Sequence, residues 1–137
     1  MKIEKILIIN PFGIGDVLFT TPLVRCLRKQ FTNSFICYIC NSRVAPLLAG
    51  NKNIDEVFVF DKGDYRALWH KDKIACLKNF IAFLGLIKSK KFDIAVDLSL
   101  GHQYAFFLML MGVPFRVGYN FKGRGRFLTH KLDLADG

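Results

Sequence analysis

Short apolar runs alternate along this chain with longer segments whose apolar residues recur at helical spacing. An apolar run with almost no polar interruption is typical of a strand that is covered on both faces. We expect strands at 5–10, 34–40, 56–61, 92–98 and 115–119, with a short last strand at 127–132. We expect helices at 15–31, 43–50, 73–90 and 103–111, and a polar loop with some helical content at 62–72. Strands that alternate with helices predict an α/β fold with a doubly wound parallel sheet.

The first predicted helix contains Pro22, which cannot donate a hydrogen bond in a helix interior. We therefore expect a first turn that ends near Thr20. Thr21 would then cap a new helical start, with Pro22 at its first position.

Length and composition predict one domain that spans residues 1–137. A chain of 137 residues with 52% hydrophobic residues can bury a substantial core, and this composition excludes a disordered protein. No internal repeat, low-complexity segment or linker is present in the sequence. The last residues, "DLADG", form neither a strong helix nor a tail. We therefore expect the sequence to be part of a longer protein.

The chain is strongly basic, with 20 lysines and arginines against 11 acidic residues and a formal charge of +9. Such a surface attracts anionic partners, which include nucleic acid, phosphorylated sugars and an anionic membrane face. The apolar run near the N-terminus is too short for a signal peptide. The apolar stretches 74–87 and 104–113 favour buried helices over membrane spans, with a membrane-facing patch as the alternative.

Four cysteines are present, and two of them, Cys37 and Cys40, have the C-x-x-C spacing. No second pair and no histidine at finger spacing accompanies them, so we predict no metal site. In a strand, two residues three positions apart point to opposite faces of the sheet. We therefore expect reduced thiols in the core.

The loop after the first strand carries Gly13, Gly15 and Asp16 where ligands bind in open parallel sheets. Leu18 stands where a dinucleotide fingerprint would have its third glycine, and no P-loop signature is present. The glycines would let the backbone turn sharply and let a ligand come close. Asp16 would then be an ionised carboxylate able to accept a proton from a hydroxyl nucleophile. The alternative is that Asp16 only caps the helix.

Three segments together resemble glycosyltransferase family nine, the ADP-heptose:lipopolysaccharide heptosyltransferases. The first is "ILIINPFGIGDVLFTTPLVRCLRKQF", with a strand, a G-D-V loop and a helix of the L-R-x-L-R type. The second is "RVAPLLAGNKNIDEVFVFD", and the third is "KFDIAVDLSLGHQYAFFLMLMGVPFRVGYNFKGRGRFLTHKL". Each motif is short, but their order and spacing make the resemblance fairly specific over nearly the whole chain.

The resemblance implies a GT-B enzyme, in which two Rossmann-like domains enclose the active site. This chain would be the N-terminal, acceptor-binding half, inactive without the C-terminal half that binds a nucleotide sugar such as ADP-heptose. Asp16 maps onto the family's general base for inverting transfer to a lipopolysaccharide core or related envelope glycan. No cofactor or metal is implied. The location would be cytoplasmic, with peripheral contact at the inner membrane as an option. Ser99, Leu100 and Gly101 depart from the family pattern, so the acceptor would differ.

Further candidates for acceptor binding lie at the predicted strand ends and in a basic segment. Besides Gly13 and Gly15, they are Thr20, Thr21, Asp97, His102, Gln103, Arg116, Arg124 and Arg126. Arginine forks match phosphates and carboxylates of a glycan. The same basic and aromatic composition would also serve RNA, and a solvated loop is the third interpretation. We rank nucleic acid below the glycan because no RNA-binding signature is present. Arg25, Arg28 and Lys29 are interpreted as a solvated face.

Overall fold

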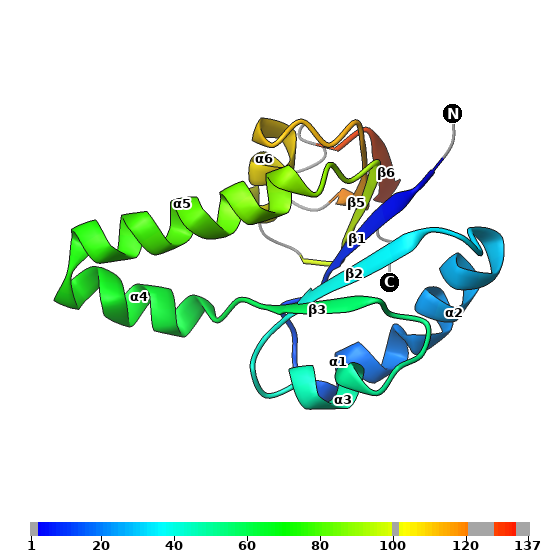
Figure 1. Ribbon diagram of the computed structural model, residues 1–137, viewed down its shortest axis with the longest axis horizontal. Helices are drawn as coiled ribbons and strands as arrows, with labels where there is room; N and C mark the ends of the chain where they lie inside the picture. Colours follow the sequence, from blue (N-terminus) through cyan, green and yellow to red (C-terminus); the bar gives the residue numbers. More distant parts are fainter. Residues whose placement is uncertain (1–2, 100–101, 121–127, 134–137) are drawn as a thin grey trace.

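Six parallel strands form one sheet in the order β3-β2-β1-β4-β5-β6 (Figure 1). The computed structural model describes residues 3–99, 102–120 and 128–133. Its strands are β1 (Lys5–Ile9), β2 (Phe35–Cys40), β3 (Glu56–Val59), β4 (Ile94–Asp97), β5 (Phe115–Asn120) and β6 (His130–Asp133). This order is that of the Rossmann fold, so the expected doubly wound α/β architecture is confirmed. The last strand is present, and it begins three residues later than expected.

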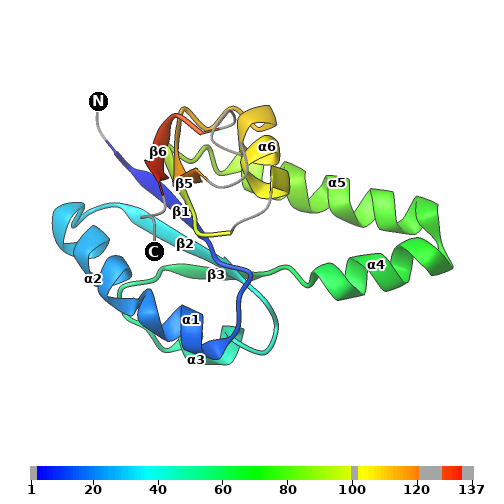
Figure 2. The same cartoon turned by 180° about the vertical axis from the view of Figure 1, so that it is seen from behind.

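Helices cover both faces of the sheet (Figures 1 and 2). Helices α1 (Ile14–Phe19), α2 (Thr21–Gln30) and α3 (Ala45–Ala49) lie on one face. Helices α5 (Lys73–Ser89) and α6 (His102–Leu110) lie on the other. Within the described ranges, no helix is both long enough and apolar enough to cross a bilayer.

The two apolar cores follow from the alternation of side chains along the central strand. Ile6 and Ile8 of β1 belong to the core under α1, α2 and α3, whereas Leu7 and Ile9 belong to the core under α5 and α6. All four are buried, which explains why β1 is an uninterrupted apolar run. Cys37 and Cys40 likewise lie in different cores, as their spacing in a strand predicts.

The segment that was expected to be a loop at 62–72 is instead mostly helical. It forms α4 (Lys62–Lys71), which is followed at once by α5. Asp72 ends α4 and caps α5, because its carboxylate Oδ1 accepts a hydrogen bond from the Ala75 amide at 3.1 Å. The two helices form a hairpin that projects beyond the sheet (Figures 1 and 2).

The break in the first helical segment occurs where the sequence predicts, but with a different capping residue. Thr20 lies between α1 and α2, and Thr21 is already the first residue of α2. The Thr20 side chain makes no capping bond to α2. Its hydroxyl donates instead to the Val17 carbonyl at 2.6 Å.

Arg28 is not part of a solvated face, as its place on the first helix had suggested. Its guanidinium lies at the amino edge of the sheet and donates to the carbonyl oxygens of Asn53 at 3.0 Å and Ser34 at 2.7 Å. It also pairs with Asp55 at 2.6 Å. The Asp55 carboxylate in turn accepts from the Ile36 amide at 2.8 Å. Arg28 therefore ties the end of α2 to the starts of β2 and β3.

Candidate functional site

The candidate site lies where the winding of the sheet reverses, between β1 and β4. Ile9 and Asp97 are paired at the carboxyl ends of these two neighbouring strands. The chain leaves β1 toward α1 on one face and leaves β4 toward α6 on the other (Figure 2). Loops that diverge in this way leave a crevice, the usual place for a ligand in an open α/β sheet. The sequence predicts both Asp16 and Asp97 at this edge.

The loop from Asn10 to Gly13 is held in place by two asparagines. The Asn10 carbonyl oxygen Oδ1 accepts a hydrogen bond from the Phe12 amide at 3.1 Å. From the end of β2, Asn41 Nδ2 donates to the Phe12 carbonyl at 3.0 Å. Asn41 Oδ1 also accepts from the amides of Arg43 and Val44 at 3.0 and 3.1 Å. The backbone that leads to Asp16 is thus fixed by side chains from two adjacent strand ends.

A buried chain of hydrogen bonds runs beneath this loop. Asn10 Nδ2 donates to the Tyr38 hydroxyl at 3.0 Å, and the hydroxyls of Tyr38 and Thr20 are 2.8 Å apart. Because the Thr20 proton is directed to the Val17 carbonyl, the Tyr38 hydroxyl donates to Thr20. Tyr38 is fully buried, and burial raises its pKa, so the hydroxyl keeps its proton.

Thr20 was expected to bind the acceptor, and the structure shows that its hydroxyl instead links β2 to the end of α1. Tyr38 and Asn10 were not anticipated as site residues. The available signal was an asparagine that closes an apolar strand, next to a strand with a single polar aromatic residue.

A further acid fixes the neighbouring loop. Asp61, just after β3, accepts a hydrogen bond from the Ser42 amide at 2.9 Å. This backbone hydrogen bond holds the pKa of Asp61 below its ordinary value. The loops that follow β1 and β2 at this edge are therefore both held by polar side chains.

Asp16 is exposed in the first turn of α1. Its carboxylate makes no hydrogen bond or ion pair with another residue of the described ranges. The N-cap position of α1 is Gly13, whose carbonyl accepts from the Val17 amide at 3.1 Å. Capping by Asp16 is therefore not what holds the helix, and its carboxylate is open to solvent.

The two glycines of this loop do not serve the sharp turn that was expected of them. Gly13 has a φ of −76°, which any residue can adopt. A Cβ atom at Gly13 or Gly15 would meet nothing within 4 Å. Space therefore lies open beside both backbones, which fits the second expectation, that a ligand can approach closely.

Asp97 is completely buried at the end of β4. Its Oδ1 accepts hydrogen bonds from the Ser99 amide at 2.9 Å and from the Ser99 hydroxyl at 2.5 Å. This arrangement stabilises the turn after β4. The carboxylate of Asp97 is therefore already engaged within the protein, and it is not exposed to a ligand.

The remaining candidates for acceptor binding lie in different parts of the chain, and not all of them are near Asp16. His102 and Gln103 open α6 on the β4 side of the crevice, as the sequence predicts. Arg116 does not lie at the crevice: it pairs with Ala95 in the amino half of β5, and its guanidinium donates to the Val113 carbonyl at 2.7 Å. Arg124 and Arg126 lie outside the described residues.

The comparisons with known proteins agree with this architecture. No protein-family profile matches the chain. Lipopolysaccharide heptosyltransferase 3 of Escherichia coli is 23% identical over 128 residues, which cover 90% of this chain and 36% of that protein. The structure of a glycosyl transferase family 9 protein from Veillonella parvula matches with a TM-score of 0.76 and 26% identity, over 98% of this chain and 37% of that one.

A third match concerns the fold alone. Escherichia coli heptosyltransferase WaaC with ADP-2-deoxy-2-fluoro heptose has a TM-score of 0.80 at 16% identity, over 96% of this chain and 43% of that one. This chain thus spans less than half the length of the proteins that it matches. In sequence and in fold, it resembles the N-terminal region of the heptosyltransferases of glycosyltransferase family 9, as its motifs predict.

Proposed function

We propose that this chain is the acceptor-binding half of an inverting glycosyltransferase with GT-B architecture. The whole enzyme transfers a heptose-like sugar from a nucleotide sugar to a lipopolysaccharide core or a related envelope glycan at the cytoplasmic side of the inner membrane. The observation that carries the proposal is the exposed, unengaged carboxylate of Asp16 at the reversal point of a sheet that resembles heptosyltransferases. In this proposal the transfer requires a donor-binding half in addition to the half described here.

In this proposal Asp16 is the general base. Its carboxylate accepts the proton of an acceptor hydroxyl while the oxygen of that hydroxyl attacks the anomeric carbon of the donor sugar. The bond from this carbon to the diphosphate breaks on the opposite face, and the nucleoside diphosphate leaves with the electron pair. The fixed loop from Asn10 to Gly13 holds the base in position, so that little reorganisation is needed during the reaction.

The acceptor in this proposal binds in the crevice between the Asp16 loop and the start of α6. The backbones of Gly13 and Gly15 leave room for it, and His102 and Gln103 border it from the other side. The basic surface attracts phosphates and carboxylates of the glycan, because the chain carries a formal charge of +9.

The test is Asp16→Asn in the complete transferase. Removing a general base lowers kcat by about 10²- to 10⁴-fold, whereas acceptor KM should change little because the amide keeps the shape of the carboxylate. Asp64→Asn, which changes another exposed aspartate, on α4, is the matched control and should keep full turnover. Undiminished turnover of Asp16→Asn would remove the base assignment.

A titration of the chain itself tests the acceptor-binding role. Lipopolysaccharide core oligosaccharide should bind and be displaced by added salt. If single-stranded RNA binds tightly with a steep salt dependence and the oligosaccharide does not bind, the chain is a nucleic-acid-binding module instead.

A further inference from the structure

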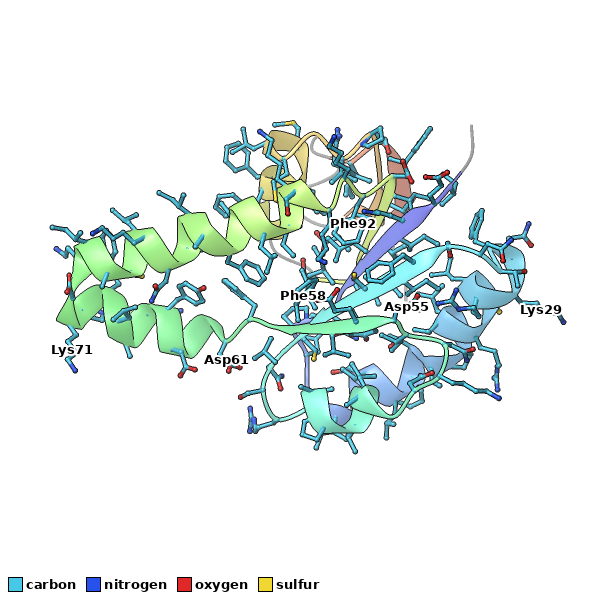
Figure 3. The ribbon with its side chains drawn as sticks, in the orientation of Figure 1. Lys29, Asp55, Phe58, Asp61, Lys71 and Phe92 are labelled. Atoms are coloured by element: carbon cyan, nitrogen blue, oxygen red, sulfur yellow. The ribbon has the colours of Figure 1, made fainter. Side chains whose placement is uncertain are left out.

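The α4–α5 hairpin carries a surface that the proposed reaction does not use. Helix α4 starts three residues after β3 ends, at the same carboxyl edge of the sheet as Asp16. The hairpin extends outward from there, with Asp61 near its base and Lys71 near its tip (Figure 3). Contacts between its helices include the edge-on meeting of Tyr65 with Phe80, at 5.9 Å between ring centroids, and the buried side chain of Cys76.

Apolar side chains also line the outside of α5. Ile74, Leu77 and Ile81 are spaced three and four residues apart, so they share one side of the helix. Their exposed fractions are 68%, 49% and 65%. The side that carries Cys76 and Ile87 is the buried one. A stripe of large aliphatic residues therefore faces solvent along the outer half of the hairpin.

The only tryptophan of the sequence precedes this stripe in the chain, near the turn between α4 and α5. Trp69 is near the end of α4 and is 41% exposed. The ammonium group of Lys73 lies 5.4 Å from the centroid of its ring. Tryptophan beside lysine at the end of an apolar surface is typical of protein segments that rest at the boundary between lipid headgroups and acyl chains.

The rim of the stripe is basic. Arg66, Lys71, Lys73 and Lys78 are all exposed around the tip. From Lys62 to Lys91 the sequence holds eight lysines and arginines against two aspartates, and one of these, Asp72, is engaged in capping α5. Lysine and arginine can keep their charges at the headgroups while their aliphatic stems cover apolar surface.

We propose that the α4–α5 hairpin docks on the surface of a bilayer that contains anionic lipid. Trp69, Ile74, Leu77 and Ile81 enter the boundary between headgroups and acyl chains, and the basic rim binds the lipid phosphates. A soluble polyanion would satisfy the lysines but would leave the aliphatic stripe in water. A second copy of the chain would bring an equally positive rim against the first. A bilayer with anionic lipid matches both the apolar and the charged parts of this surface.

Docking of this kind has a consequence for the proposed reaction. The hairpin and the Asp16 loop leave the sheet at the same edge, so a docked hairpin holds the acceptor crevice close to the lipid surface. A glycolipid acceptor would then be reached while it is still anchored. The docking itself depends only on residues of the hairpin and does not require that the transferase proposal be correct.

Fluorescence of Trp69 measures the docking directly, since the sequence holds no other tryptophan. Adding vesicles of phosphatidylcholine and phosphatidylglycerol in equal parts should shift the emission to the blue. Phosphatidylcholine carrying brominated acyl chains in the same vesicles should quench it. Vesicles of phosphatidylcholine alone should bind at least tenfold more weakly, because each lysine or arginine near an anionic surface adds about 1 kcal/mol, and 1.4 kcal/mol is tenfold in affinity.

Matched variants separate the two parts of the surface. Ile81→Ser should weaken vesicle binding about tenfold, whereas Leu47→Ser, at an exposed leucine on α3, should not. Lys71→Gln together with Lys78→Gln should weaken binding to anionic vesicles about tenfold or more. The same change at Arg25 and Lys29 on α2 should have little effect. All six positions are exposed, so thermal unfolding should be unaltered.

Three results would overturn the docking. They are an unchanged Trp69 emission with anionic vesicles, equal binding of Ile81→Ser and the original chain, and a blue shift with single-stranded RNA but none with vesicles. A blue shift that grows with protein concentration in the absence of lipid would mean that a second copy covers the stripe. Loss of vesicle binding with full transfer to a soluble acceptor would leave the proposed function standing.

Discussion

Buried polar side chains at the carboxyl edge decide where the candidate base is held. The Tyr38 hydroxyl is the central member, since it accepts from Asn10 and donates to Thr20 in a site without solvent. Removing this hydroxyl leaves the buried side-chain amide N–H of Asn10 without an acceptor. An unpaired buried donor costs more free energy than the hydrogen bond contributes when it is formed.

Tyr38→Phe should therefore lower the free energy of unfolding by about 1–3 kcal/mol. Urea denaturation measures this loss, with the dependence on urea concentration unchanged. Tyr65→Phe is the matched control, because the Tyr65 hydroxyl makes no hydrogen bond to another described residue, and it should lose less than about 0.5 kcal/mol. Equal stability of Tyr38→Phe and the original chain would contradict the role assigned to the hydroxyl.

The buried thiol of Cys37 should make the free energy of unfolding depend on pH in the alkaline range. Burial raises its pKa from the ordinary 9.0 to about 12. Between these values the unfolded chain has lost the proton and the folded chain has kept it. The contribution to stability is therefore complete below pH 9 and is lost as pH rises through about 12, by at most about 1.4 kcal/mol per pH unit.

Cys37→Ala should make the loss of stability between pH 9 and 12 less steep, as measured by urea denaturation across this range. Burial also raises the pKa of Cys40, to about 11, and that of Tyr38, so part of the pH dependence should remain. Cys26→Ala, at an exposed cysteine, should leave the pH dependence unchanged. An identical pH dependence in Cys37→Ala would show that the thiol is not protonated in the way described.

At the scale of single residues, the sequence predicts which side chains lie at the carboxyl edge, because this depends only on their position relative to the strands. Asp16 follows β1 and Asp97 ends β4, and their place at one edge could be predicted because parallel strands end at the same edge of a sheet. The roles of Tyr38 and Asn41 could not be predicted. They depend on which atoms face each other across neighbouring strands, and this is set by register and side-chain rotamers rather than by spacing. For the same reason the burial of Asp97 was missed.

Elements are joined at the opposite edge of the sheet by the Arg28 guanidinium. Arg28→Lys keeps the charge but loses the planar fork that reaches the Asn53 and Ser34 carbonyls together with Asp55. We expect a loss of about 2 kcal/mol, with a small share from the Asp55 pair because that carboxylate is partly exposed to solvent. Chemical denaturation measures it. Arg25→Lys, at an exposed arginine of the same helix, should be neutral, and an equal loss there would contradict the assignment.

Most elements could be predicted because their apolar period and their flanking turn residues agree. Helix α4 was the exception. Its stretch is rich in charged residues and shows little apolar periodicity, which favoured a loop. It is helical because α5 offers an apolar partner: Tyr65 of α4 stacks on Phe60 at 4.7 Å between ring centroids and meets Phe80 of α5. Such support comes from tertiary packing, which outweighs weak local propensity.

At the scale of the whole molecule, stability should be graded from the sheet to the hairpin. The central strand β1 is buried on both faces, whereas α4 packs mainly on α5 and extends beyond the sheet (Figure 1). Local opening is easiest where few buried contacts hold a segment. Hydrogen exchange should therefore be fastest in α4 and the first turns of α5 and slowest at Leu7–Ile9. Equal protection in both regions would show that the hairpin and the sheet open together.

The position of Arg28 opposite Asp16 has an evolutionary consequence. Arg28 cross-links elements at the amino rim of the sheet. The carboxyl rim combines the buried hydrogen bonds of Tyr38 with exposed loop residues such as Asp16 that contribute little to stability. Substitutions at the exposed rim can accumulate without approaching the threshold of unfolding. A scaffold divided in this way can acquire a new ligand specificity in small steps, each of them tolerated before it becomes useful.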